Sequence, residues 1–233
     1  MKLYPSTAST PRRLRFGERL VRGLSRFPQT APLADTVRVH NGSLRAAHEA
    51  RVALEPAVED RSDDVRFGEV DAESIARRLN ARCHELDGDR AGAVTRVGFP
   101  DGLSVVLAPQ GEAQAQSFQR LRTAYAESAD PTVAAHRDEL VGLADKAIAA
   151  FVPAYAAWVD AVRARDAAFT VELLRRREHR RAVNAVFGAI RSAFPEDRRL
   201  QDAIVPELGV SRGRSAEDED DGGDDPAPTD PEL

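Results

Sequence analysis

Cysteine is almost missing from the chain, because Cys83 is the only one. One cysteine allows no intramolecular disulfide and no metal site built from several cysteines. The neighbouring His84 does not turn it into a nucleophile–base pair, since adjacent side chains on a helix point about 100° apart. We therefore expect Cys83 to be a buried structural residue.

Aromatic residues are scarce as well, at 6% of the chain, and long apolar runs are missing. A core built mostly from Ala, Val and Leu suits closely packed helices. The longest apolar run, residues 147–159, contains a proline and is too short to span a bilayer of about 30 Å, so we expect a buried core helix there. Because the N-terminal residues hold no apolar segment typical of a secretory signal, the sequence predicts a cytoplasmic protein without membrane contact.

Motifs of several enzyme classes are also absent. The chain has no phosphate-binding G-x-x-x-x-G-K, no dinucleotide-binding G-x-G-x-x-G and no Glu-x-x-His pair of the di-iron bundles. His48-Glu49 and His84-Glu85 begin like H-E-x-x-H, but neither has the second histidine. We expect no metal, no cofactor and no catalytic residue, and the sequence favours a non-enzymatic protein.

Charge is distributed unevenly along the chain. Only Lys2 and Lys146 of the 33 basic residues are lysines, so 31 are arginines. The whole chain carries a net charge of -5, and residues 216–233 hold nine acids and no base, so residues 1–215 carry a net charge of +4. The acidic segment lacks the apolar residues that would offset the entropy of ordering it, and the sequence predicts a disordered tail.

The remaining pattern is helical. An amphipathic helix is expected over residues 12–27, and Phe27-Pro28 and Phe194-Pro195 are expected to end helices, because proline disfavours helix in the residue before it. From Val37, seven of eight positions at sevenfold spacing are apolar, which predicts one long helix. Pro56 and Gly68 argue against an undisturbed helix. We expect a kinked helix, or else a break near Gly68 with Asp71 as the N-cap of the next helix. A shorter helix is expected from Gly111, and another should start at Pro131.

A second sevenfold pattern follows Pro131. Its two rows are Val141, Ile148, Tyr155, Val162, Phe169, Arg176, Val183 and Ile190, and Ala144, Phe151, Trp158, Arg165, Glu172, His179, Val186 and Ala193. We expect Trp158 to be buried with Phe151 and Tyr155. A helix of about 60 residues would extend roughly 90 Å, against a diameter near 45 Å for a compact body of this size, so the protein is either elongated or folds back near Gly68 and Arg165. The lack of a turn signal favours the elongated form.

One stretch, VTRVGFPDGLSVVLAP at residues 94–109, differs from this pattern. Its valines and leucines favour strands, and Phe99-Pro100-Asp101-Gly102 has the composition of a type I turn. We predict a small β-hairpin over residues 94–107 that caps one end of the bundle. The turn accounts for Asp101, which we do not expect to be catalytic.

These observations predict an all-α fold, an elongated antiparallel bundle or long helical hairpin with a β-hairpin cap. Residues 1–10 should be a flexible N-terminus, residues 11–208 a single helical domain and residues 209–233 a disordered acidic tail.

Two functions fit this organisation. The preferred one is assembly or protein-partner binding, including self-association, through the helical faces. The alternative is a nucleic-acid- or polyanion-binding protein masked by its own tail, because two groups of arginines could contact phosphates. The arginines assigned to this site are Arg12, Arg13, Arg15, Arg19, Arg175, Arg176, Arg177, Arg180 and Arg181. Arg22 and Arg26 extend the first group.

Overall fold

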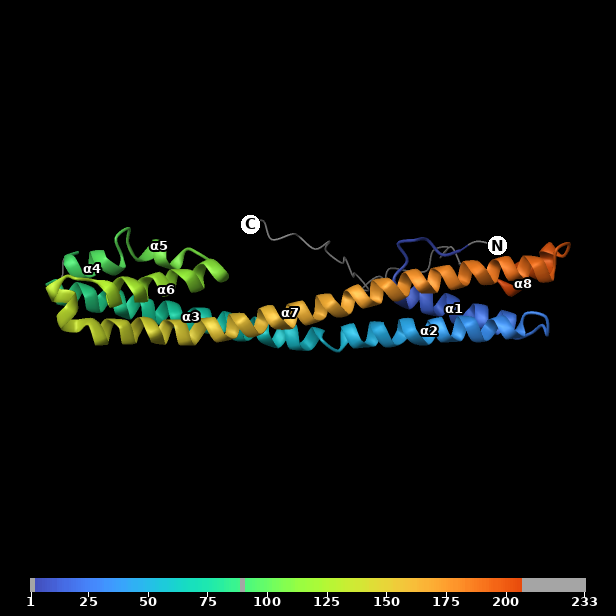
Figure 1. Cartoon of the computed structure of the whole chain (residues 1–233), viewed down its shortest axis with the longest axis horizontal. Helices are drawn as coiled ribbons and strands as arrows, with labels where there is room; N and C mark the ends of the chain where they lie inside the picture. Colours follow the sequence, from blue (N-terminus) through green and yellow to red (C-terminus); the bar gives the residue numbers. More distant parts are fainter. Residues whose placement is uncertain (1–2, 89–90, 207–233) are drawn as a thin grey trace, which may run out of the picture. The chain divides into compact units, whose positions relative to one another are not determined.

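All regular secondary structure in the computed structural model is helical within the residues it describes, 3–88 and 91–206 (Figure 1). The eight helices of these ranges are α1 (Thr10–Leu24), α2 (Ala31–Val52), α3 (Glu55–Leu86), α4 (Ala93–Gly98), α5 (Leu103–Leu107), α6 (Glu112–Glu127), α7 (Pro131–Ala193) and α8 (Arg198–Ile204). The predicted all-α class is confirmed. The predicted acidic tail lies outside the described residues.

The chain forms two compact units. Unit 1 comprises Met1–Asn41 and His179–Leu233, and unit 2 comprises Gly42–Glu178. The helices α2 and α7 each contribute residues to both units. The stretch predicted to be one helical domain, residues 11–208, is thus divided between the two, and elongation of the molecule stays a prediction.

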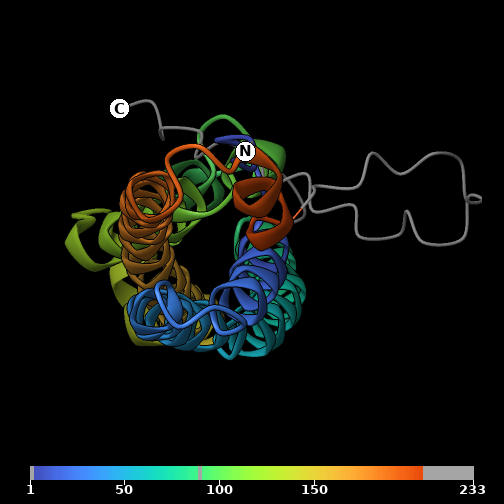
Figure 2. The same cartoon turned by 90° about the vertical axis from the view of Figure 1, so that its right-hand side faces the viewer.

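Unit 1 encloses an apolar core to which the N-terminal segment contributes. Tyr4 packs edge to face on Phe16 of α1, with the ring centroids 5.2 Å apart, and α8 lies beside α1 (Figure 2). The sequence predicts a flexible segment over residues 1–10, whereas Tyr4 and Ala8 are buried. Tyr4 attaches this part of the chain to unit 1, because it contributes both a ring to the core and a hydroxyl that hydrogen-bonds to buried His179. The flexibility of residues 1–10 stays a prediction.

The two Phe-Pro pairs lie where unit 1 helices end. α1 stops at Leu24 and α7 at Ala193, directly before Phe194-Pro195. The rings of Phe27 and Phe194 then meet edge to face, with centroids 6.0 Å apart. The prediction that helices end at these two Phe-Pro pairs is confirmed.

Unit 2 has its own core between α3, α6 and the first part of α7, and α4 and α5 lie against α6 (Figure 1). The predicted helix after Gly111 is α6, and Pro131 begins α7, both as expected. The core residues are Ala72, Ala76, Leu79, Cys83, Val94, Phe99, Val106, Phe118, Leu121, Tyr125, Val133, Leu140, Ala144, Ala147 and Phe151.

The long helix predicted from Val37 is interrupted at the first of the two positions that argue against a continuous helix, Pro56 and Gly68. α2 ends at Val52 and α3 begins at Glu55, so the break falls just before Pro56 and not at Gly68. Proline has no N–H to donate, and it is tolerated in the first turn of a helix, where a backbone N–H would have no intrahelical acceptor. α7, in contrast, continues through Pro153 and Arg165 as one helix.

The predicted β-hairpin over residues 94–107 is wrong, because this stretch forms α4 and α5. The Asp87 carboxylate accepts hydrogen bonds from the backbone N–H groups of Gly92, Val94 and Thr95 at 3.0, 3.1 and 2.8 Å, which satisfies donors at the start of α4. The predicted turn does form. The N–H of Gly102 donates to the carbonyl of Phe99 at 3.1 Å, and Gly102 has a φ of 90°. This turn joins two helices instead of two strands.

The apolar part of α7 is only partly covered. An 18-residue window of this helix has a mean hydropathy of 1.4, and 22% of the window is buried. Its length and composition would suffice to cross a membrane, although core helices of soluble proteins meet the same criterion. The absence of membrane contact and the cytoplasmic location stay predictions.

Gly68 has a packing role in unit 2. A Cβ atom added at Gly68 would lie 2.5 Å from the backbone carbonyl oxygen of Ala150, so α3 and α7 approach closely at this point. Gly142 of α7 differs, because an added Cβ there would meet no atom within 4 Å. The glycine that the sequence analysis assigns to a kink thus permits a helix–helix contact.

Replacing Gly68 with alanine should therefore destabilise the protein. Helix propensity alone predicts a gain of about 1 kcal/mol, but the clash with the Ala150 backbone should cost about 1–3 kcal/mol and outweigh it. Gly142→Ala is the matched control and should stabilise by about 0.5–1 kcal/mol. Urea unfolding measures both changes, and equal gains for the two variants would contradict the close helix contact.

Candidate functional site

The arginines of α1 are not equally available for binding. Arg12, Arg15 and Arg19 are exposed, whereas Arg13 is buried. The Arg13 Nε–H donates to the carbonyl of Ala8 at 2.7 Å, and its guanidinium lies over the Tyr4 ring, 4.9 Å from the centroid. The structure therefore places Arg13 inside unit 1 and leaves the other three on its surface.

The second arginine group, on α7, is divided in the same way. Arg177 and Arg181 are exposed, but Arg175 pairs with Glu178 at 2.6 Å and Arg176 with Glu172 at 2.9 Å. Arg180 is partly buried, and its Nη1 atom has no hydrogen-bond partner among the described residues. Two of these five side chains, Arg177 and Arg181, are thus exposed and take part in none of the ion pairs of the described residues.

A cleft of about 230 Å³ in unit 1 is lined by three arginines. Arg19, Arg22 and Arg26 line it, together with Gly23 of α1 and with Ala203, Ile204 and Pro206 at the C-terminal end of α8. The first two lie one turn apart on α1, and Arg26 follows in the next turn of the chain. Of the nine arginines assigned from sequence, only Arg19 belongs to this cleft.

Unit 2 contains a buried ion cluster centred on Glu172 of α7. The Glu172 side chain is 0% exposed, and its carboxylate accepts a hydrogen bond from Arg51 Nε at 2.8 Å and lies 3.2 Å from His48 Nδ1. Arg176 completes the cluster, and both guanidinium groups approach the Phe169 ring, at 5.9 Å for Arg51 and 5.6 Å for Arg176. Because three basic side chains already contact the Glu172 carboxylate, it connects α2 to α7 and is not available to bind a substrate.

Unit 1 contains a buried neutral chain of hydrogen bonds. His179 Nε2 lies 2.7 Å from Asn41 Oδ1, and His179 Nδ1 lies 2.7 Å from the Tyr4 hydroxyl. Because Oδ1 can only accept, Nε2 carries the proton, and Nδ1 accepts from Tyr4. Burial, and next the positive charge of Arg13, lower the pKa of His179 to about 4, so this imidazole is neutral at pH 7.

Cys83 is buried, as the sequence predicts. Its Sγ atom lies 2.9 Å from the Tyr125 hydroxyl, and burial raises the pKa of the thiol to about 11. The thiolate is the nucleophilic form of cysteine, so the thiol is inert at neutral pH.

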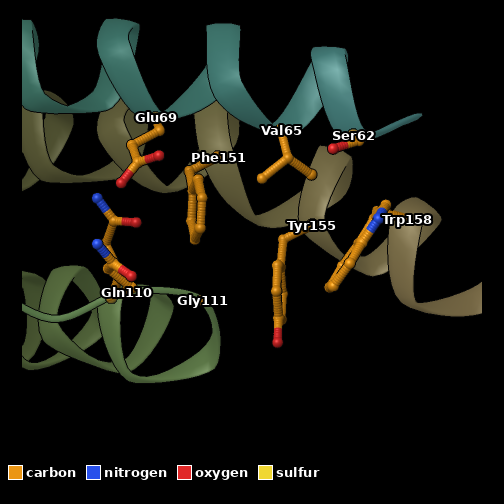
Figure 3. A pocket seen from close by; sticks show the side chains of 9 residues that line it. Ser62, Val65, Glu69, Gln110, Gly111, Phe151, Tyr155 and Trp158 are labelled. Atoms are coloured by element: carbon orange, nitrogen blue, oxygen red, sulfur yellow. The ribbon is translucent and has the colours of Figure 1, made fainter. Parts of the chain in front are cut away.

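A cavity of about 280 Å³ lies in unit 2, and α3, the start of α6 and α7 each contribute to its wall (Figure 3). Three aromatic side chains of α7 form one side. Phe151 and Tyr155 are stacked with centroids 5.7 Å apart and planes 17° apart, and Tyr155 and Trp158 follow at 5.8 Å and 37°. The polar side chains come from Ser62 and Glu69 of α3 and from Gln110 and Gln114. We call this the aromatic cavity.

Two polar groups of the aromatic cavity lack protein partners. Gln114 is 0% exposed, and neither its Nε2 nor its Oε1 atom has a hydrogen-bond partner among the described residues. An unsatisfied buried polar group costs about 1–3 kcal/mol, so such a group in a native fold calls for an explanation. Glu69 is partly buried, and none of the ion pairs or hydrogen bonds of the described residues includes it.

Sequence reasoning missed this cavity because it treated the aromatic residues as core. Phe151 is buried, at 1% exposure, but Tyr155 and Trp158 are partly exposed, so the prediction that Trp158 is buried is wrong. Their shared face of α7 is as predicted. One feature of the sequence could have indicated the cavity. Ser62 and Glu69 lie seven residues apart on α3, and their side chains are too small or too polar to fill the space opposite three rings.

No group of three or more His, Cys, Asp or Glu side chains suited to a metal ion occurs in residues 3–88 and 91–206. The chain matches no protein-family model, and comparisons with curated proteins and with solved structures gave no match.

Proposed function

We propose that the protein is a non-enzymatic helical protein that binds a partner protein, or a second copy of itself, through its helical faces. The observation that carries this proposal is the aromatic cavity, with its volume of about 280 Å³. Binding sites are typically concave and mostly apolar, with a few placed polar groups, and tyrosine and tryptophan are enriched where proteins meet. No histidine, cysteine, lysine or arginine lines the cavity, which favours binding over catalysis.

Site-specific cross-linking tests this proposal. A photoreactive benzoylphenylalanine replaces Gln110, which is exposed at the cavity rim, and in a control protein it replaces Phe67, which is 62% exposed on α3 outside the cavity. We expect a cross-linked product from position 110 only. A product of twice the chain mass identifies self-association, and one of any other mass identifies a different partner.

The same cross-link should depend on an open cavity. Ser62→Phe places a ring in the cavity and should abolish the product, whereas Ser62→Ala should preserve it, because the removed hydroxyl is at an exposed position. A product that survives Ser62→Phe, or none at all from position 110, would refute the cavity as the contact point.

Polyanion binding is the second candidate, supported by the cleft of Arg19, Arg22 and Arg26. Arginine suits phosphate because its planar guanidinium donates two parallel hydrogen bonds. Replacing these three arginines with glutamine should weaken binding to single-stranded DNA or heparin at about 50 mM salt by at least about tenfold and lower the slope of log K against log salt by about 2–3. Deleting residues 216–233 from the protein with all its arginines should tighten polyanion binding, because the acidic tail competes for the arginines as a tethered polyanion.

A matched triple variant separates a specific cleft from net charge. Arg61, Arg66 and Arg77 of α3 each form an ion pair one turn away, with Asp64, Asp63 and Glu73. Replacing these three with glutamine removes the same charge and should change the salt slope little. Equal losses from the two triple variants, or no polyanion binding by the tail-deleted protein at about 50 mM salt, would eliminate this second function.

A further inference from the structure

We infer that the aromatic cavity binds a guanidinium group, carried either by an arginine side chain of a bound protein or by a small guanidino compound. This inference rests on the proposed function of the cavity as a binding site and names the chemistry of its ligand.

The charge of the wall selects for a cation. Glu69 is the one charged residue among the nine that line the cavity, and no ion pair of the described residues neutralises it. A negatively charged ligand would meet this carboxylate with no compensating base. A cationic group gains a charge-assisted hydrogen bond to it, which is about twice as strong as a neutral one.

The aromatic rings select for a flat or alkylated cation. Cations are attracted to the negative faces of tryptophan, tyrosine and phenylalanine, and guanidinium also stacks on them. Phe151, Tyr155 and Trp158 supply three such rings along one side of the cavity. In the view of Figure 3, the rings of Tyr155 and Trp158 extend from α7 away from Val65 and Ser62 of α3. Gly111 lies close to Tyr155, because a Cβ added at Gly111 would be in van der Waals contact with the Tyr155 hydroxyl at 3.4 Å.

The remaining polar atoms match the donors of guanidinium better than those of ammonium. A guanidinium presents five N–H donors in one plane. Acceptors in the wall come from the Glu69 carboxylate, the Gln110 and Gln114 carboxamides and the Ser62 hydroxyl. The unpartnered Gln114 Oε1 gains its missing donor from such a ligand. Its Nε2 then needs an acceptor, which a carbonyl oxygen elsewhere on the ligand provides, as in a peptide that contains arginine.

The size of the cavity agrees with one side chain. Its volume of about 280 Å³ lies just below the range of about 300–1,000 Å³ that is typical of sites for drug-sized molecules. This space is large enough for an arginine side chain with its planar head.

The full-length protein provides its own reporter, because Trp158 is the only tryptophan in the chain and lines the cavity. Fluorescence titration with N-acetylarginine methylamide should give a saturable change. The citrulline analogue has the same shape without the charge and should bind at least tenfold more weakly. The trimethyllysine analogue tests the competing preference for ammonium, and tighter binding of it, or equal binding of the citrulline analogue, would overturn the inference.

Two variants assign the response to the cavity. Glu69→Gln should weaken binding of the arginine probe at least tenfold, whereas Asp71→Asn, which neutralises an exposed acid two residues further along α3, should leave it unchanged. Gln114→Met removes the unsatisfied carboxamide, so it should raise the melting temperature of the free protein and still weaken binding. An unchanged affinity in both Glu69→Gln and Gln114→Met would overturn the inference.

The source of the guanidinium and the proposed function are tested separately. A short peptide with a central arginine that binds more tightly than the methylamide identifies a protein ligand, and equal affinities identify a small guanidino compound. If the cross-link at position 110 depends on an open cavity but no arginine probe binds, the ligand chemistry is wrong and the partner-binding function stands. If the probes bind but no such cross-link forms, the partner-binding function is wrong.

Discussion

Replacing Glu172 with glutamine should lower the free energy of unfolding by about 3–5 kcal/mol, the usual cost of removing one partner from a buried ion pair. The Glu172 side chain is fully buried, while those of Arg51 and Arg176 are only 17% and 19% exposed. Glutamine keeps the volume but removes the charge, and its amide nitrogen adds a donor where the arginines already supply donors. Guanidinium unfolding at pH 7 measures the loss.

Glu178 provides the control on the same helix. It pairs with Arg175 at 2.6 Å, but the two side chains are 33% and 41% exposed. Exposed pairs typically contribute about 0.2–1 kcal/mol, so Glu178→Gln should cost no more than that. A loss below about 1 kcal/mol for Glu172→Gln as well would show that water reaches the cluster and that burial adds nothing to it.

The polar positions of the sevenfold pattern show how far the sequence could predict this cluster. Arg51, Glu172 and Arg176 all interrupt rows of apolar residues, and their place on the helix faces follows from spacing alone. Their pairing does not follow from spacing, because Arg51 and Glu172 are 121 positions apart in the chain. Only the register between α2 and α7 brings them together, and periodicity on each helix does not determine that register.

The failed hairpin has a different cause. Residues 103–107, LSVVL, form a short apolar run, and a run of that length cannot be assigned to strand or helix by its period. The start of the stretch is stabilised by a residue outside it, since Asp87, at the end of α3, accepts hydrogen bonds from backbone donors of α4 seven and eight positions further along. An isolated two-stranded hairpin is only marginally stable in water, which further favours helices packed on α6.

The aromatic cavity could be predicted only in part. Helical spacing correctly places Phe151, Tyr155 and Trp158 on one face of α7. Whether that face is filled depends on the residues opposite, and Gln110 and Gly111 reach it through a loop whose path the sequence does not specify. The exposure of Trp158 therefore depends on packing between helices, which the residue pattern of one helix cannot predict.

The second large effect concerns pH and the buried His179. Its pKa is about 4 in the folded protein and about 6.5 in an unfolded chain, with burial as the main cause and the charges of Arg13 and His40 adding to it. Between these values the unfolded state binds a proton that the folded state does not, so stability falls as the pH falls. A difference of about 2.5 pH units corresponds to a loss of about 3 kcal/mol between pH 6.5 and pH 4, and none of this loss occurs above pH 7.

His179→Gln isolates this effect from the titration of carboxylates over the same range. Glutamine accepts a hydrogen bond from Tyr4 and donates one to Asn41 without binding a proton, so the variant should be less stable at pH 7 but lose less stability on acidification. Urea unfolding at several pH values between 7 and 4 gives the two slopes. Identical slopes for the wild type and His179→Gln would mean that the folded protein protonates His179 without cost. A shallower slope for the variant would show that the neutral Tyr4–His179–Asn41 chain makes unit 1 sensitive to acid.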